Sequence, residues 1–372
     1  MKNFLKRNLF IVFIGLMTFS GCSDDDDNPR VIPGEQGFFI VNEGLFGAGN
    51  ASLSFFNKQT EEIQNDVFFE ANNRPLGDQA QSMIVTDGRG YVVVQNSNKI
   101  EVINAEDFTS ITTIDENDGL QSPRYLLVVS DSKAYISDWG PSGATGFLRV
   151  LDLNTNEITN SISVGFGPNR MVLSGDNVYL THSGRFNDQT FEFIPDQTLM
   201  IINTNTDAVT TEIELGDNSN AAQVDNAGNV WVSGAGNLVF GGAPDFALDL
   251  DASTSGYIAR ISPNNVILFE LPVKGTGPNN LEINPNGDLL YFNYQGAIVT
   301  ASTTLNSSNE IEINSFISKS FYGFSVDPVS GEFIGGVAPN FTSDGSIERY
   351  TTSGTLIDSY TVGIGPNGAV FK

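Results

Sequence analysis

The residues that could do chemistry in this sequence are amide, charged and aromatic side chains that recur next to short hydrophobic runs. One set follows these runs directly: Asn42, Glu43, Gln95, Asn96, Asp138, Trp139, His182, Asn293 and Tyr294. A second set lies where one run leads toward the next: Arg124, Asn169, Arg170, Asn280 and Tyr322. Amides donate and accept hydrogen bonds, and aromatic faces stack on flat molecules. This composition favours non-covalent binding of a large, neutral, amide-rich ligand or a glycan.

Catalytic and metal-binding patterns are weak by comparison. His182 is the only histidine, and its neighbour Ser183 does not by itself make a catalytic pair. A corrinoid metal could accept His182 as an axial ligand, although a lone histidine more often forms surface hydrogen bonds. Asp245, Asp249 and Asp251 are close enough in sequence for Ca²⁺ but match calcium loops poorly. We therefore expect no metal, no cofactor and no enzymatic activity.

The elements that position these side chains repeat along the chain. Each has a hydrophobic strand that changes abruptly to polar or small residues. Seven segments share this form, at Phe38–Gly44, Gly90–Ser97, Ala134–Gly140, Val178–Gly184, Val230–Gly236, Leu290–Gly296 and Phe333–Pro339. Gly- and Asn-rich turns precede most of them, and further alternating strands follow. The repeat predicts seven four-stranded antiparallel sheets packed radially as a β-propeller.

Closure of the ring can also be predicted. The first unit shows only three strands, at Phe38–Asn42, Leu53–Asn57 and Glu62–Phe68. The tail, Asn367 to Lys372, is a single strand without a unit of its own. We expect the tail to complete the first blade. In a propeller of this kind, the two polar sets above lie on the same face and rim the central channel. The loops after Trp139, Arg185 and Asn237 are longer than the others and could wall a pocket there.

The N-terminal segment indicates export. Lys2, Lys6 and Arg7 precede an apolar stretch that is too short to cross a bilayer, and Phe19 to Cys22 resembles a bacterial lipobox. We expect residues 1–21 to be a signal peptide and Cys22 to be lipidated. Residues 22–36 would form a tether, and residues 37–372 the propeller. The acidic run 24–27 resembles the signal by which Bacteroidota send lipoproteins to the cell surface, so we expect a lipid-anchored, surface-exposed protein of the outer membrane.

Net charge limits the partners. The formal charge is −26, and cleavage before Cys22 would remove three basic residues and no acidic one, which gives −29. Such a field repels phosphate backbones, so we expect no nucleic-acid binding. Membrane contact would occur through the lipid anchor alone.

Two features resemble known families. The Gly-x-Gly-Pro-Asn segments 165–169, 275–279 and 363–367, with their following turns and strands, are similar to YncE-like seven-bladed propellers. Residues 37–44 (GFFIVNEG) and 50–57 (NASLSFFN) resemble the opening of DUF5074-type surface propellers of Bacteroidota. That group includes lipoproteins that capture cobalamin above a TonB-dependent transporter. The resemblance implies that the chain binds a corrinoid and passes it to such a transporter, and it assigns no ligand residues.

Two other functions remain open. A surface propeller that binds glycans or proteins as an adhesin or scaffold would show an exposed aromatic platform and no deep pocket. A lyase-like propeller enzyme would need His182 in a cleft beside a nucleophile or an acid.

Overall fold

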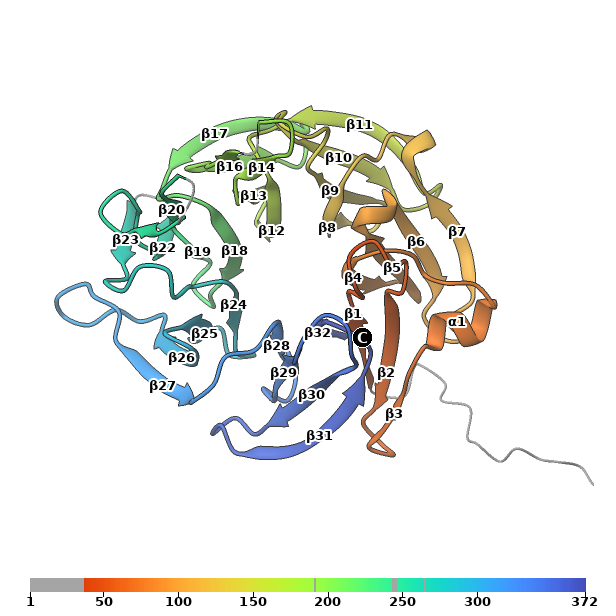
Figure 1. Cartoon of the computed structure of the whole chain (residues 1–372). Helices are drawn as coiled ribbons and strands as arrows, with labels where there is room; N and C mark the ends of the chain where they lie inside the picture. The colour runs from red at the N-terminus through yellow and green to blue at the C-terminus, as the bar shows by residue number, and fades with distance from the viewer. Residues whose placement is uncertain (1–36, 191, 243–245, 264) are drawn as a thin grey trace, which may run out of the picture. The chain divides into compact units, whose positions relative to one another are not determined.

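Seven four-stranded antiparallel sheets follow one another around a ring in the computed structural model of this chain (Figure 1). The structure describes residues 37–190, 192–242, 246–263 and 265–372. The expected signal peptide, the lipidated Cys22 and the acidic tether lie outside these residues. No helix in the described ranges is long and apolar enough to cross a membrane. The prediction of a seven-bladed propeller with four-stranded blades is confirmed.

The strands of each blade run from the channel outward in the following order. Blade 1 has β32 (Pro366–Phe371), β1 (Gly37–Asn42), β2 (Ser52–Asn57) and β3 (Glu62–Gln64). Blades 2 and 3 have β4 (Ala80–Thr86), β5 (Arg89–Val94), β6 (Lys99–Asn104) and β7 (Ser110–Ile114), then β8 (Pro123–Ser130), β9 (Lys133–Asp138), β10 (Phe147–Asp152) and β11 (Glu157–Ser163). Blade 4 has β12 (Pro168–Ser174), β13 (Asn177–His182), β16 (Thr198–Asn203) and β17 (Ala208–Glu214).

The remaining blades follow the same order. Blade 5 has β18 (Ser219–Val224), β19 (Val230–Gly234), β22 (Tyr257–Ser262) and β23 (Asn265–Glu270). Blade 6 has β24 (Leu281–Ile283), β25 (Leu289–Tyr294), β26 (Ala297–Ser302) and β27 (Ile313–Ile317), and blade 7 has β28 (Phe324–Val326), β29 (Phe333–Val337), β30 (Gly345–Tyr350) and β31 (Leu356–Val362). Two small hairpins, β14–β15 (Arg185–Asn187 and Glu192–Ile194) and β20–β21 (Val239–Phe240 and Leu248–Asp249), project from blades 4 and 5.

The C-terminal strand closes the ring, as the sequence predicts. β32 pairs antiparallel with β1, with Phe38 opposite Phe371 and Ile40 opposite Ala369. The Phe38 ring lies 4.9 Å from that of Phe56 and 5.5 Å from that of Phe371. Blade 1 therefore joins the two ends of the described chain, and its apolar residues pack against Ile334 and Ile347 of blade 7.

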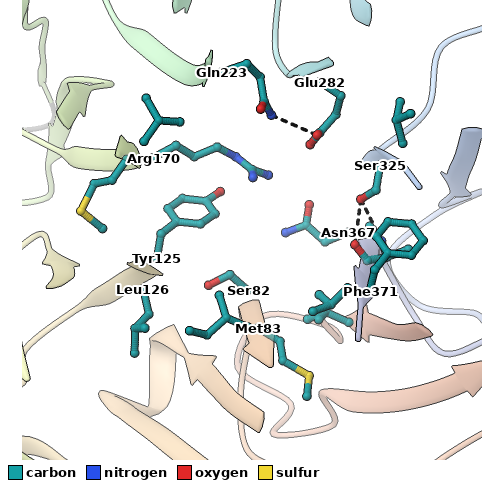
Figure 2. A pocket seen from close by; sticks show the side chains of 18 of the residues that line it. Ser82, Met83, Tyr125, Leu126, Arg170, Gln223, Glu282, Ser325, Asn367 and Phe371 are labelled. Atoms are coloured by element: carbon teal, nitrogen blue, oxygen red, sulfur yellow. Dashed lines mark hydrogen bonds between the residues drawn. The ribbon is translucent and has the colours of Figure 1, made fainter. Parts of the chain in front are cut away.

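The innermost strands line the central channel and share an irregular start. β8, β12 and β32 each begin with a proline, and the pairing register shifts just after Pro123, Pro168 and Pro366. Proline has no N–H to donate, so it is tolerated at the first position of a strand, and the bulge turns the next side chains out of the regular pleat. Figure 2 shows Tyr125, Arg170 and Asn367, which follow these prolines, converging on the channel.

One predicted strand is partly wrong. We expected Glu62–Phe68 to be extended, but β3 ends at Gln64 and the short helix α1 (Val67–Asn72) follows. Asp66, in the left-handed region at φ 54°, turns the chain, and Val67 and Phe68 then become buried. An apolar pair after Asn65-Asp66 is compatible with either extended or helical backbone, so local pattern alone does not decide between them.

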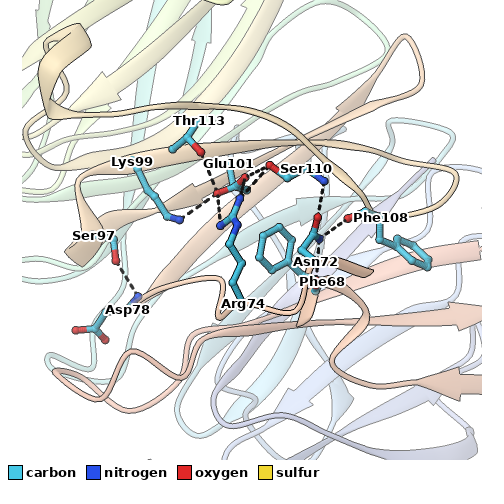
Figure 3. Close-up of polar contacts among 10 residues, drawn as sticks. All are labelled: Phe68, Asn72, Arg74, Asp78, Ser97, Lys99, Glu101, Phe108, Ser110 and Thr113. Atoms are coloured by element: carbon cyan, nitrogen blue, oxygen red, sulfur yellow. Dashed lines mark hydrogen bonds and ion pairs between the residues drawn. The ribbon is translucent and has the colours of Figure 1, made fainter. Parts of the chain in front are cut away.

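A buried carboxylate fixes the connection from blade 1 to blade 2 (Figure 3). Glu101 on β6 is fully buried and accepts hydrogen bonds from Arg74 at 2.6 Å, Lys99 at 3.0 Å and Ser110 at 2.6 Å. Burial alone would raise the pKa of Glu101, but Arg74, Ser110 and Lys99 outweigh it and lower the pKa. The Arg74 guanidinium also lies 4.9 Å from the Phe68 ring, which ties α1 to the same cluster.

We expect Glu101→Gln to lower the free energy of unfolding by about 2 kcal/mol, because Arg74 and Lys99 lose their charged partner. The effect stays moderate because Arg74 is partly exposed and water can solvate its charge. Since the folded pKa of Glu101 is depressed, its stabilisation is present above the unfolded pKa of about 4.3 and is lost as pH falls through the lower folded pKa. Urea unfolding of both proteins at pH 7 and pH 3 measures the loss of stability and its pH dependence. The exposed Glu106→Gln is the control. Equal stability of the two variants at pH 7 would contradict a stabilising role.

Candidate functional site

The loops after the second strands and the connections between blades lie on one face of the ring, which we call the loop face. Backbone hydrogen bonds join the two sets directly: Trp139 N–H donates to Ser122 O and Ser183 N–H to Gly167 O, both at 2.9 Å. This arrangement follows from the chain order, because each inner strand begins where each second strand ends. The side chains predicted to bind a ligand therefore start from the same face.

The first cavity on the loop face has a volume of about 590 Å³ and is lined by residues of blades 1 to 4. It contains four of the predicted residues, Gln95, Arg124, Trp139 and Asn169. Sequence reasoning did not assign its remaining side chains to binding, and these include Phe46, Arg185, Phe186 and Phe193. The volume falls within the range of small-molecule sites in proteins.

Arg124 and Trp139 form the polar centre of this cavity. The Arg124 guanidinium lies 4.3 Å from the Trp139 ring and donates to Gln95 Oε1. Arg185 stacks on the same ring at 5.6 Å and donates to the backbone oxygens of Trp139 and Gly140. Burial lowers the pKa of Arg124, but an arginine stays charged. The cavity thus has an aromatic ring in contact with two cations in a strongly acidic protein.

Nine buried side-chain polar atoms lack a partner within the described ranges, and three of them belong to residues that line this cavity: Arg124 Nε, Trp139 Nε1 and Asn169 Oδ1. Buried polar atoms in folded proteins nearly always have a hydrogen-bond partner. Their grouping at a single cavity shows bonding capacity that the fold itself does not use.

A second cavity, of about 540 Å³, adjoins the first across Ser183 and Phe193. Asn218, Asn220 and Phe240 contribute to its lining. The β14–β15 and β20–β21 hairpins form parts of the walls, so the long loops after Arg185 and Asn237 border these two cavities.

Exposed aromatic side chains gather on the loop face. Eight such side chains are exposed in the described ranges. Phe69 lies on α1, in the connection from blade 1 to blade 2, and the other seven lie in loops after second strands or in the connection to blade 7. The seven are Phe46, Phe186, Phe193, Phe240, Phe246, Tyr322 and Phe341. Phe46 is 68% exposed and Phe240 57%. Rings that remain accessible on one face are available for stacking on a ligand or for contact with a partner.

Glu43 and Tyr322 form a hydrogen bond near the end of the channel at the loop face, where both were predicted to lie. Tyr322 donates to Glu43 Oε2 at 2.5 Å, and Asn367 donates to Glu43 Oε1 at 2.7 Å. Burial raises the pKa of Glu43, although the Tyr322 hydrogen bond and the charge of Arg124 act in the opposite direction. Asn367 was expected only as part of the closing strand. Its place in the repeated Gly-x-Gly-Pro-Asn motif, which it shares with the predicted Asn169, is the signal that could have placed it here.

Several other predicted residues make contacts that hold the fold. Asp138 is fully buried and accepts from the backbone of Gln121, Ser122 and Gly140 and from Arg149 Nε at 3.0 Å. Tyr294 lies in the apolar core around blades 5 and 6, where its hydroxyl accepts from Val273 N–H.

The predicted amides Asn42, Asn280 and Asn293 are likewise buried, and each donates within the protein. Asn96 is exposed and donates to Asp78 at 2.5 Å. None of these four amides lines the two loop-face cavities.

His182 is locked inside blade 4. It is fully buried, Nε2 accepts from Gly165 N–H at 3.1 Å, and Nδ1 lies 3.1 Å from Thr198 O. These partners require a neutral ring with its proton on Nδ1, and burial lowers the pKa of His182 in agreement. Neither ring nitrogen is left for a metal or for a nucleophile. Ser183 bonds to backbone oxygen of Gly167 instead.

The acidic loop contains no group of metal ligands within the residues that the structure describes. Asp249 Oδ1 accepts from the backbone of Asp251 and Ala252, as in an ordinary turn. Asp245 lies outside the described residues.

The central channel contains polar side chains that sequence reasoning largely missed. Tyr125, Gln223 and Glu282 line it together with the predicted Arg170 and with Asn367. The missed residues lie within the inner strands, where a two-residue alternation does not show which side chains reach the channel. The distance from the start of the inner strand was the one available signal, and it differs among blades: the register shifts after Pro168 in β12 and after Ser219 in β18, and β24 pairs without a shift.

Comparison with protein families identifies the family to which this propeller belongs. Residues 36–363 match the model of a family described as a domain of unknown function, DUF5074. The chain belongs to the DUF5074 family. This match covers nearly the whole propeller and agrees with the resemblance carried by residues 37–57. A search of curated proteins finds no match.

Solved structures similar to this DUF5074 propeller share its fold at low identity. A quinonprotein alcohol dehydrogenase-like protein from Bacteroides thetaiotaomicron is 14% identical, with a TM-score of 0.62, and the match covers 91% of this chain and 78% of that one. A functionally unknown protein from Desulfotomaculum acetoxidans is 13% identical, with a TM-score of 0.62 and coverage of 90% and 98%. Hydrazine synthase from Kuenenia stuttgartiensis is 12% identical, with a TM-score of 0.57 and coverage of 85% and 90%. At such identities the likeness concerns the fold alone.

Proposed function

We propose that this DUF5074 propeller is a cell-surface lipoprotein that captures a corrinoid, cobalamin first, on its loop face and passes it to a TonB-dependent outer-membrane transporter. The observation that carries the proposal is the pair of adjoining loop-face cavities under a rim of exposed aromatic rings. The Arg124–Trp139 stack occupies the deeper part of the first cavity.

The chemistry of the face suits a corrinoid. A corrinoid is large and flat, carries several amides at its edge and has an anionic phosphate in its nucleotide arm. Aromatic rings stack on flat conjugated surfaces, and Asn and Gln side chains can pair with amides. The cations Arg124 and Arg185 beside Trp139 offer a place for the phosphate.

The sequence supports the location and the partner. Cys22 would anchor the protein in the outer membrane, and the acidic run after it would direct the protein to the cell surface. The loop face projects exposed apolar rings, which are the residues most often enriched at protein contacts. A transporter could meet the propeller on this face, so that a ligand held there moves directly between the two.

A binding role also accords with the position of His182. Both ring nitrogens have partners inside blade 4, so the catalytic arrangement considered from sequence does not form around it. The alternative of a glycan- or protein-binding surface propeller draws support from the same exposed rings, because sugars also stack on aromatic faces.

Titration of the full chain, purified in mild detergent, with cyanocobalamin by calorimetry tests the proposal. We expect saturable binding of one ligand with a Kd of about 1 µM or below, equivalent to about 8 kcal/mol. Absence of heat at ligand concentrations on the order of 100 Kd would overturn corrinoid capture. Binding to a glycan array under the same conditions would then move the surface-adhesin function to first place.

A further inference from the structure

The central channel holds two charged side chains that do not neutralise each other by contact. Arg170 enters from β12 and Glu282 from β24, two blades away, around a cavity of about 440 Å³ (Figure 2). Among the described residues, the guanidinium of Arg170 has no hydrogen-bond or ion-pair partner, and its defined contact is the Tyr125 ring at 4.7 Å. A guanidinium held on one face by an aromatic ring keeps its N–H donors directed at the space around it.

Glu282 is also only partly satisfied. Gln223 Nε2 donates to Glu282 Oε2 at 3.0 Å and to Leu281 O at 3.1 Å, while Oε1 has no partner in the described ranges. Burial raises the pKa of Glu282 to about 7, and the positive charge of Arg170 offsets this only in part. Glu282 is half-buried in the channel wall and has no bonded cation among the described residues, so a positively charged group placed beside it would be attracted to its carboxylate.

Part of the remaining channel wall is apolar, although Gln81, Ser82, Ser325 and Asn367 also line it. Met83, Leu126 and Met171 each follow a polar inner-strand residue toward the face opposite the loops, and Phe371 lies at that end of β32. Methionine and leucine side chains adapt to apolar groups of varied shape. The channel therefore combines one cation, one anion and an apolar wall within a volume that suits a small molecule.

We propose that the channel binds a zwitterionic amino acid with an apolar side chain. Its carboxylate would pair with Arg170 beside Tyr125, its ammonium group with Glu282, and its side chain would pack against Met83, Leu126 and Met171. A ligand of this class satisfies both charges at once, which neither a simple anion nor a simple cation does. The site is separate from the loop-face cavities, and the proposal does not depend on corrinoid capture.

Calorimetric titration of the full chain in mild detergent with L-methionine tests the proposal. We expect saturable binding of one molecule, weakened about tenfold or more for the methyl ester, which lacks the carboxylate, and for N-acetyl-methionine, which lacks the ammonium group. Lack of binding at millimolar concentration, or equal binding of either derivative, would overturn the proposal.

Substitutions locate the site. Arg170→Gln and Glu282→Gln should each weaken L-methionine binding about tenfold or more, while Arg89→Gln removes one positive charge outside the channel lining and should not. Glu282→Gln keeps the side-chain shape and removes a buried charge, so it should fold even if Arg170→Gln does not. Unchanged binding by a folded Glu282→Gln protein would refute the assignment.

The pH dependence gives an independent readout. Gln223, an uncharged amide, and Arg170, a guanidinium, are the groups that face Glu282. With a pKa of about 7, Glu282 is mostly ionised at pH 8 and mostly protonated at pH 6. L-methionine binding should therefore weaken about tenfold between pH 8 and pH 6. In Glu282→Gln the pH dependence should disappear. A wild-type affinity that is flat across this range would contradict the role of Glu282.

Discussion

A chain that ends at Gly365 is expected to lose its cooperative unfolding transition. This truncation removes β32, the innermost strand of blade 1, and leaves the hydrogen-bonding edge of β1 unpaired. Phe38 loses its contact with Phe371, and the channel loses the part of its wall that β32 forms between blade 7 and blade 2. Because folded domains are stable by only about 5–15 kcal/mol, loss of a complete central strand removes most of that margin. Thermal unfolding followed by circular dichroism measures the effect.

Removal of Lys372 alone is the matched control, because this residue follows β32 and lies outside it. The melting temperature of the chain without Lys372 should equal that of the full chain. Phe38→Ala should have an intermediate effect of about 3–5 kcal/mol, since it leaves a cavity where a fully buried ring stacked on Phe56. A truncated chain that still unfolds cooperatively within a few degrees of the full chain would show that ring closure contributes little.

The propeller could be predicted because its signal is repeated. The seven second strands, among them β5, β13 and β25, are fully flanked by other strands, so their hydrophobic runs end sharply where the chain emerges on the loop face. Repetition makes each assignment support the others. The segment after β3 lacked that support. Val67 and Phe68 belong to no repeated element, and packing of Phe68 against Arg74 favours the helix there.

The candidate site was predictable only in part, for a physical reason. Trp139 and Tyr294 occupy similar places, at or just after the end of a second strand, and the local sequence pattern does not distinguish them. Trp139 turns toward the loop-face cavity, whereas Tyr294 turns into the core and accepts from Val273 N–H. The side to which a terminal side chain turns depends on neighbouring loops. Glu282 was missed because its significance comes from Arg170 and Gln223, which other blades contribute.

The second large effect is expected at Trp139. Trp139→Ala should weaken cyanocobalamin binding about thirtyfold or more, equivalent to about 2 kcal/mol, because a partly buried tryptophan between two arginines is the kind of residue on which binding energy concentrates. Arg124 would also lose the ring that orients its guanidinium. Calorimetric titration of the variant measures the change, and its melting temperature shows whether the fold is retained.

Phe69→Ala provides the matched control, since Phe69 is an exposed aromatic residue on α1 that lines neither loop-face cavity. It should leave binding unchanged, whereas Phe193→Ala, between the two cavities, should weaken it. Equal effects of Phe69→Ala and Trp139→Ala would mean that general apolar exposure drives binding. An unaltered affinity of Trp139→Ala together with a large loss in Phe193→Ala would move the ligand to the second cavity. The relative affinities of these three variants for cyanocobalamin therefore report where on the loop face the ligand lies.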